Sequence, residues 1–214
     1  MKERSDVSGI VRDSIGAVIL AAGASSRMGR PKQLLEYNGL TLVRRAALAA
    51  RDAGCDPVVV VTGADAEELE KELRELNLQE ANNPAWESGM GSSIRAGIQA
   101  VKANDKITAV VLMLCDQPFV TSNVLSALIA AHRKTGREIV ASSYGGTIGV
   151  PALFGKAFFT ELLRLEGEAG AKQVIQRDLT QVHLLPFPQG EIDIDTPADF
   201  ARLRSWDLRG IVNS

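Results

Sequence analysis

The segment 18–32 reads V-I-L-A-A-G-A-S-S-R-M-G-R-P-K, and the fold of this chain is decided there. Its first three residues form a short apolar run that is typical of a buried strand. Small residues follow, and then cations at Arg27, Arg30 and Lys32. Small residues let backbone N–H groups approach anionic oxygens, and nearby cations neutralise the remaining charge. The segment therefore predicts a strand that ends in a phosphate-binding loop.

This loop differs from the two commonest nucleotide-binding loops. It lacks the Gly-Lys-Ser/Thr end of G-x-x-x-x-G-K-[ST], and it lacks the three spaced glycines of G-x-G-x-x-G. Pro31 stiffens the chain before Lys32, which reduces the entropy that the lysine loses when it binds a ligand. On chemistry alone, a glycine-rich connection that carries surface cations remains an alternative.

The composition favours one large globular domain. The chain has 214 residues, of which 45% are apolar, enough to build a core. Its net charge is −2, so no overall basic field attracts nucleic acid or anionic lipid. Residues 1–14 are mostly polar, so we expect no signal peptide, and no later segment reaches membrane-spanning length. We expect a cytoplasmic protein without nucleic-acid or membrane partners.

The cysteines and histidines carry no recognisable motif. Cys55 and Cys115 lie in apolar surroundings without C-x-x-C or paired-histidine spacing, which argues against zinc and against a disulfide framework. We predict that both are reduced core residues. His132 and His183 have no serine or carboxylate pattern around them, so we interpret both as structural or surface residues.

Apolar runs alternate with amphipathic segments along the chain. After the first strand, strands are predicted at 57–61, 109–114, 139–141 and 182–186, and helices at 41–54, 65–76, 94–102, 121–133, 156–165, 171–177 and 196–206. Thr41 and Thr121 are the predicted N-caps of their helices. The segment 145–154 breaks the alternation and reads as an excursion.

This alternation predicts a three-layer α/β fold, in which a mostly parallel sheet has right-handed crossovers and helices on both faces. We assign an N-terminal extension to residues 1–15, a single domain to residues 16–206 and a C-terminal tail to residues 207–214. Ligands bind beyond the carboxyl ends of the strands in such sheets. The loop after residue 20 and Asp116 both fall at such ends.

Asp116 is the strongest single catalytic candidate. It follows the buried run 109–114 almost directly, and Pro118 prevents the strand from continuing, so its carboxylate is held at the binding edge of the sheet. Aspartate also favours turns and helix caps. The residues alone leave both interpretations open.

A second carboxylate pair lies near the end of the chain. Asp193 and Asp195 are two apart in an extended segment, so their side chains share one face. Two carboxylates that face no obvious lysine or arginine are costly unless a cation joins them. Mg²⁺ fits, because it is bound by one or two carboxylates together with phosphate oxygens. Alternatively, Asp195 or Thr196 caps the last helix, and the two roles can coexist.

Six blocks of the sequence resemble, in order, the molybdopterin nucleotidyltransferase family. They are L-A-A-G-A-S-S-R-M-G-R-P-K at 20–32, G-M-G-S-S at 89–93, D-Q-P at 116–118, G-V-P-A-L-F at 149–154, G-E-A-G-A-K at 167–172 and D-I-D-T-P-A-D at 193–199. The first block looks most like the molybdenum cofactor cytidylyltransferases, because guanylyltransferase relatives typically read L-A-G-G where this chain reads L-A-A-G. The resemblance implies a Rossmann-like nucleotidyltransferase fold.

The resemblance also implies roles for single residues. Lys32, Arg27 and Asp116 would be catalytic, and Asp116, Asp195 and Asp193 would hold Mg²⁺. Nucleotide binding falls to Leu20, Ala21, Ala22, Gly23, Ala24, Ser25, Lys32, Gly91, Ser92 and Ser93, and acceptor binding to Gly149, Pro151, Gly170 and Lys172. The family's acidic block more often reads G-D-x-G-A-R, and here Glu168 and Lys172 replace its aspartate and arginine. Lys172 lacks the bidentate fork of arginine.

The implied activity is transfer of CMP from CTP to the terminal phosphate of molybdenum-loaded molybdopterin, with release of pyrophosphate and Mg²⁺ as cofactor. That phosphate is ionised near pH 7, so catalysis needs positioning and charge neutralisation rather than a general base. The implied recipient of the product is an apo-molybdoenzyme or its chaperone. The alternatives are a cytidylyltransferase acting on a sugar or polyol phosphate, a nucleotide-binding regulator without turnover, and a repurposed oxidoreductase of the same superfamily.

Overall fold

The computed structural model describes the backbone of residues 14–207 and the side chains of residues 14–205. Most of the predicted N-terminal extension and of the C-terminal tail lies outside these residues. The first strand, β1 (Ser14–Leu20), begins two residues before the predicted start of the domain. The assignment of residues 16–206 to a single domain stays a prediction.

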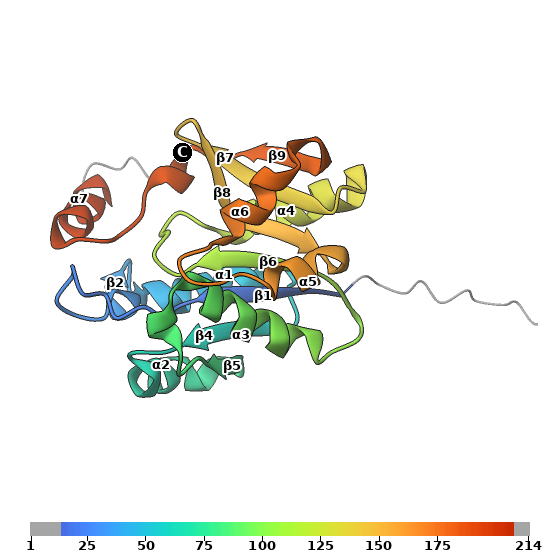
Figure 1. Ribbon diagram of the computed structural model, residues 1–214. Helices are drawn as coiled ribbons and strands as arrows, with labels where there is room; N and C mark the ends of the chain where they lie inside the picture. Colours follow the sequence, from blue (N-terminus) through green and yellow to red (C-terminus); the bar gives the residue numbers. More distant parts are fainter. Residues whose placement is uncertain (1–13, 208–214) are drawn as a thin grey trace, which may run out of the picture.

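A seven-stranded sheet in the order β5-β4-β1-β6-β8-β7-β9 forms the centre of the molecule (Figure 1). After β1 its strands are β4 (Val58–Thr62), β5 (Gln79–Asn82), β6 (Ile107–Leu114), β7 (Ile139–Tyr144), β8 (Thr147–Gly155) and β9 (Val182–Pro186). The described pairs are parallel except those that β8 makes with β6 and β7. The predicted mostly parallel sheet is confirmed.

Helices cover both faces of the sheet, as the alternation predicts (Figure 1). One face carries α1 (Leu42–Asp52), α2 (Ala66–Leu73) and α4 (Ser122–Thr135), and the other carries α3 (Met90–Lys102), α5 (Phe159–Leu162) and α6 (Ala171–Arg177). Successive residues of β1 serve the two layers, because strand side chains alternate between the faces. Ile19 packs in the first cluster and Val18 in the second.

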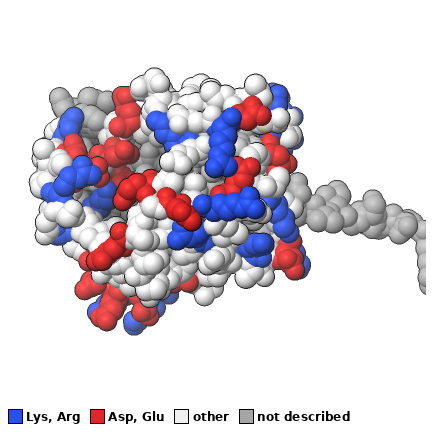
Figure 2. All heavy atoms as spheres, viewed as in Figure 1, with Lys and Arg blue, Asp and Glu red and all other residues white. Residues whose placement is uncertain are grey.

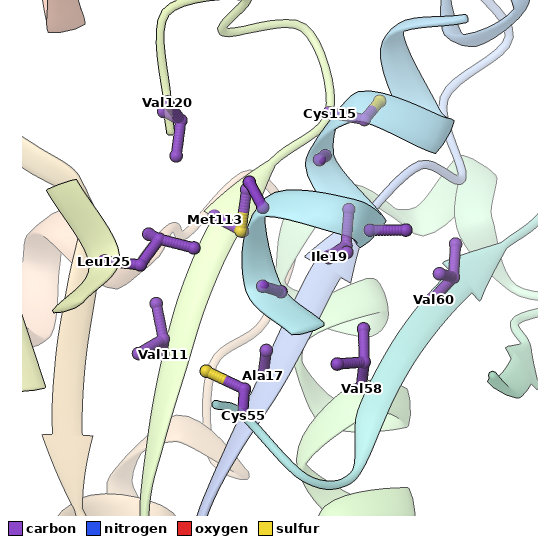
Figure 3. Packing of buried hydrophobic residues seen from close by; sticks show 14 of the residues in the cluster. Ala17, Ile19, Cys55, Val58, Val60, Val111, Met113, Cys115, Val120 and Leu125 are labelled. Carbon is purple, nitrogen blue, oxygen red and sulfur yellow. The ribbon is translucent and has the colours of Figure 1, made fainter. Parts of the chain in front are cut away.

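The first of these clusters is shown in Figure 3, where Ile19 of β1 and Met113 of β6 lie among side chains of the neighbouring strands and of α4. Cys55 and Cys115 belong to the same cluster, and both are buried and free. Figure 3 places them at opposite ends of it. Burial raises the pKa of the Cys55 thiol to about 12. The prediction of reduced core cysteines is confirmed.

A smaller cluster lies beyond the carboxyl edge of the sheet. A hairpin of β2 (Glu36–Tyr37) and β3 (Leu40–Thr41) packs there with α7 (Pro197–Asp207), as Figure 1 shows on its left side. Leu35, Ile194 and Leu203 are almost fully buried in this cluster. This cluster holds the segment around Ile194 against Leu35, which follows the loop after β1.

Short 3₁₀ helices connect several of these elements. They are η1 (Lys32–Leu34), η2 (Arg74–Leu76), η3 (Trp86–Ser88), η4 (Lys156–Phe158), η5 (Leu179–Gln181) and η6 (Pro188–Glu191).

None of the helices within residues 14–207 is long and apolar enough to cross a membrane.

Two local expectations are wrong, and one short hairpin was not predicted. The segment predicted as an excursion contains β8, a buried strand between β6 and β7. Pro151 of β8 lies at a register shift between β7 and β8 and has no paired residue there, so its missing N–H breaks no hydrogen bond of the sheet. The segment 33–40, for which no strand was predicted, contains the β2–β3 hairpin. Helix α3 starts at Met90, four residues earlier than predicted. Thr41 and Thr121 are the N-caps of α1 and α4, as predicted; the Thr41 hydroxyl accepts from the Arg44 N–H, whereas the Thr121 side chain makes no capping hydrogen bond.

Candidate active site

A pocket of about 520 Å³ lies at the carboxyl edge of the sheet, where the loop after β1 and the turn after β6 meet. It is lined by Leu20, Ala21, Ala22, Gly23, Arg27, Lys32, Gln33, Trp86, Glu87, Gly89, Met90, Ser93, Leu114, Cys115, Asp116, Glu168, Asp193 and Asp195. On the face seen in Figure 2, positive and negative side chains are intermixed without a large area of one sign.

The loop after β1 is held by Gln33, which was not among the predicted site residues. This side chain is 1% exposed, and its Nε2 donates to the carbonyl oxygens of Ala21 (2.9 Å) and Gly23 (2.7 Å). Ser25 Oγ donates to Gln33 Oε1 and accepts from the Lys32 N–H at 3.0 Å. The Ser25 hydroxyl therefore closes the loop, and its shape is fixed before any ligand binds. The only signal in the sequence that could have identified this residue is its position directly after Lys32.

We predict that Gln33→Leu loosens this loop. The two carbonyl oxygens would lose their buried donor, and each unsatisfied group costs about 1–3 kcal/mol. Affinity for a nucleoside triphosphate, measured by calorimetry, should fall, and the melting temperature should fall with it. Gln99→Leu, on the exposed face of α3, serves as the control and should leave both unchanged. Unchanged triphosphate affinity in Gln33→Leu would mean that the loop keeps its shape without this side chain.

Lys32 lies between two carboxylates. Its Nζ donates to Asp116 Oδ2 at 2.5 Å and to Asp195 Oδ1 at 2.7 Å, while the Arg27 guanidinium donates to Asp195 Oδ2 at 2.8 Å. Burial alone would lower the pKa of Lys32, but Asp116 and Asp195 outweigh burial and raise it. The hydrogen bond from Lys32 in turn lowers the pKa of Asp195.

The expectation that the acidic pair faces no lysine or arginine is wrong for Asp195. Lys32 and Asp195 are 163 residues apart in sequence and meet only at the sheet edge. Thr196, rather than Asp195, caps α7. The Thr196 hydroxyl accepts from the Asp199 N–H at 3.3 Å, and Asp199 Oδ2 accepts from the Thr196 N–H at 2.9 Å. Asp195 is therefore left to face the pocket.

The donor set fits a divalent cation that also binds phosphate. Asp116 Oδ1 is buried and has no hydrogen-bond partner among the described residues, and Asp193 and Asp195 line the same pocket. Within residues 14–207, no group of three or more His, Cys, Asp or Glu side chains is arranged to hold a metal by itself. Mg²⁺ commonly takes only one or two carboxylates and completes its shell with phosphate oxygens and water. Asp116 with Asp195 or Asp193 satisfies that requirement.

Asp193 is the carboxylate with the least favourable surroundings. It lies at the accessible side of the pocket, yet partial loss of hydration, together with the charges of Asp116 and Asp195, raises its pKa to about 6. In the unfolded chain the pKa of this carboxyl would be close to 3.8. The folded protein therefore binds its proton more tightly than the unfolded chain does.

We predict that Asp193→Asn stabilises the protein at neutral pH but not in acid. Because the folded pKa is raised, the ionised carboxylate destabilises the fold; this cost is absent below the unfolded pKa of 3.8, grows as the pH rises and is complete above about pH 6. Solvent screening limits the gain to about 1 kcal/mol. Urea unfolding with a chelator at pH 4.5 and 7.5 tests this, with Asp105→Asn as a surface control. An equal gain at both pH values would contradict it.

The N-terminus of α3 forms another wall of the pocket and is organised by Asn83, a second residue that was not predicted. Asn83 is 5% exposed, and its Nδ2 donates to Ser92 Oγ at 2.8 Å and to Ser93 Oγ at 3.0 Å. Ser93 lines the pocket, whereas Ser92 and Gly91, also predicted to bind nucleotide, are buried and are not part of its lining. Asn83 follows the unpredicted strand β5, so the sequence pattern gave no reason to select it.

The predicted acceptor residues lie outside this pocket. Gly149, Pro151, Gly170 and Lys172 are absent from its lining, and so are Ala24 and Ser25 of the loop. Lys172 Nζ instead donates to Thr147 Oγ1 at 2.6 Å. The pocket is completed by side chains that were not assigned to it, namely Trp86, Glu87, Met90 and Glu168.

A loop of small residues, a lysine and paired carboxylates at the carboxyl edge of a mostly parallel sheet are the features expected of a nucleotidyltransferase. The model of the MobA-like NTP transferase domain matches residues 17–182, which is most of the chain. The chain belongs to this family. The predicted family and the Rossmann-like nucleotidyltransferase fold are confirmed.

Relatives of this chain carry several names. It is 40% identical over 123 residues to nicotine blue oxidoreductase of Paenarthrobacter nicotinovorans, a match that covers 56% of this chain and 57% of that protein. It therefore spans little more than half of that relative. It is 27% identical over 190 residues to molybdenum cofactor cytidylyltransferase of Escherichia coli, covering 87% of this chain and 94% of that protein. The structure of Rv0371c from Mycobacterium tuberculosis is 29% identical, with a TM-score of 0.75 and coverage of 89% and 97%.

Proposed function

We propose that this protein transfers CMP from CTP to the terminal phosphate of molybdenum-loaded molybdopterin and releases pyrophosphate. One observation carries the proposal: Lys32, Asp116 and Asp195 converge beside a preformed phosphate-binding loop. That arrangement supplies what phosphoryl chemistry requires, which is positioning and charge neutralisation. The likeness to the E. coli cytidylyltransferase extends over nearly the whole chain and supports this choice of substrates.

Asp116 and Asp195 would hold a divalent cation, with Asp193 as the further candidate ligand, and we propose Mg²⁺. The unpartnered, buried Asp116 Oδ1 supports this, and one relative from M. tuberculosis, 29% identical with a TM-score of 0.73, was solved as a complex with manganese. When bound, the ion supplies positive charge to the phosphate oxygens. The remaining work falls to the side chains and backbone of this chain.

In the proposed reaction the acceptor phosphate attacks the α-phosphorus of CTP. A P–O bond forms to the acceptor, and the bond to the β-phosphate oxygen breaks in line with it, releasing pyrophosphate. Lys32 and Arg27 neutralise the charge that accumulates on the transferring and leaving groups. The loop N–H groups, fixed by Gln33, orient the triphosphate. Both reacting phosphates are ionised near pH 7, so no side chain has to remove a proton.

A cytidylyltransferase acting on a sugar or polyol phosphate is the second candidate. The residues predicted for the pterin acceptor, Gly149 and Lys172 among them, do not line the pocket, so the acceptor assignment lacks the direct support that the nucleotide assignment has. The similarity to nicotine blue oxidoreductase makes a redox activity a further alternative, but that match covers only 56% of this chain. An apo-molybdoenzyme or its chaperone is the proposed recipient of the product.

The test is Mg²⁺-dependent release of pyrophosphate from CTP, GTP or ATP, with molybdenum-loaded molybdopterin or a panel of sugar and polyol phosphates as acceptor. Asp116→Asn should abolish release, and Asp105→Asn is the surface control. Release with CTP and the pterin alone supports the proposal. Release only with a sugar or polyol phosphate favours the second candidate. Nucleotide binding without any release indicates a regulator without turnover.

A further inference from the structure

Part of the pocket carries negative charge that nothing in the described protein neutralises. Glu87 and Glu168, which line it beside the N-terminus of α3, have no hydrogen-bond or ion-pair partner among the described residues. The two cations of the pocket, Arg27 and Lys32, are already paired with carboxylates. This part of the pocket therefore repels phosphate and attracts groups that donate hydrogen bonds.

The backbone that carries Glu168 is clamped against α3. The Gly91 N–H donates to the Gly167 carbonyl at 3.0 Å, and the Arg95 guanidinium donates to the Leu165 carbonyl. At Gly89, with φ of 99°, a Cβ would overlap the Gly167 carbonyl group, so only glycine allows this approach. The Glu168 side chain is exposed, but the backbone that carries it is held in a fixed position relative to the pocket.

We propose that Glu168 binds the acceptor by accepting hydrogen bonds from the N–H groups of its pterin ring. The inference rests on the proposed function and names the part of the acceptor that is recognised. A 2-amino-4-oxo ring presents two parallel N–H donors, which match the two oxygens of one carboxylate. The acceptor phosphate then lies toward Lys32 and Arg27, away from the unneutralised carboxylates.

The neighbouring side chains suit a flat ring. Met90, which is 41% exposed, and the partly buried Trp86 line the same pocket as Glu168 and offer apolar surface to stack against. The cytosine of CTP fits Glu168 less well, because its pairing edge places two acceptors beside a single amino group. Glu168 is thus assigned to the acceptor rather than to the nucleotide.

The experiment compares two ring probes, 6-hydroxymethylpterin and 6-hydroxymethyllumazine, which differ in having an amino group or a carbonyl oxygen at position 2. Fluorescence titration of the full protein with CTP and Mg²⁺ should show the pterin binding about tenfold more tightly, as expected for a charge-assisted pair near solvent. Glu168→Gln should lose this preference. Glu166→Gln, an exposed glutamate outside the pocket, should keep it.

Calorimetry with CTP separates this inference from the proposed function. Equal affinity of the two rings for the wild-type protein, no detectable ring binding at millimolar concentration, or a preference that survives Glu168→Gln would each overturn the assignment. It would also be overturned if Glu168→Gln weakened CTP binding and left pterin binding unchanged. If CTP does not bind while the Glu168-dependent preference persists, the proposed transfer fails and the assignment stands.

Discussion

Replacement of Lys32 by methionine is expected to lower the rate of pyrophosphate release from CTP by about 10²–10³-fold, the usual loss when one preorganised charge is removed from a transition state. Lys32 is the only described cation that contacts both Asp116 and Asp195, so no neighbour replaces it at that position. The measurement is steady-state release at saturating CTP and acceptor. Lys156→Met, on the surface at η4, is the matched control.

The same substitution has a second effect that must be measured separately. Without Lys32, the largely buried carboxylate of Asp116 has no cation beside it, and the loss of a partner from an ion pair destabilises the fold. Thermal melting of Lys32→Met with and without Mg²⁺ distinguishes this effect from lost catalysis. A folded variant that retains more than about one tenth of the wild-type rate would contradict the role assigned to Lys32.

Gly97→Ala is expected to destabilise the protein by about 2 kcal/mol, although alanine normally stabilises a helix by about 1 kcal/mol relative to glycine. Gly97 lies where α3 crosses β1 and β4, and a Cβ there would overlap Val18 and lie 2.9 Å from Val61. Both neighbours are β-branched and belong to the central sheet, so neither can move far. Urea unfolding measures the loss.

Gln99→Ala on the exposed face of α3 controls for helix propensity and should leave the stability nearly unchanged. If Gly97→Ala proved as stable as the wild-type protein, α3 would have to move away from the sheet. In that case the positions of Ser93 and of the pocket wall should change as well, and affinity for CTP would report that movement.

The sequence predicted the parts of this protein that depend on local pattern. The apolar run at 18–20 became β1, Thr41 capped α1, and Asp116 emerged at the edge after β6. Spacing also placed Asp193 and Asp195 on one face, and both line the pocket. Each of these features is set by a few neighbouring residues, so a single sequence is sufficient to read them.

Features that depend on distant partners could not be predicted. The pairing of Lys32 with Asp195 joins residues that only the folded sheet brings together. Strand β8 contains a proline, which usually argues against a central strand, and the register shift that tolerates it involves β7. Asn83 donates hydrogen bonds to the hydroxyl groups of two serines on α3, which belong to a different element. In each case the sequence around one residue contains no pattern that identifies its distant partner.

The position of Lys32 between Asp116 and Asp195 implies a linkage between substrate and cofactor. A divalent ion and the lysine compete for the negative charge of the same two carboxylates, so the ion should bind weakly until triphosphate draws the lysine away. CTP and Mn²⁺ are therefore expected to bind cooperatively, and each must raise the affinity of the other by the same factor. The free protein would then discriminate against stray metal ions and accept the metal–nucleotide complex as one unit.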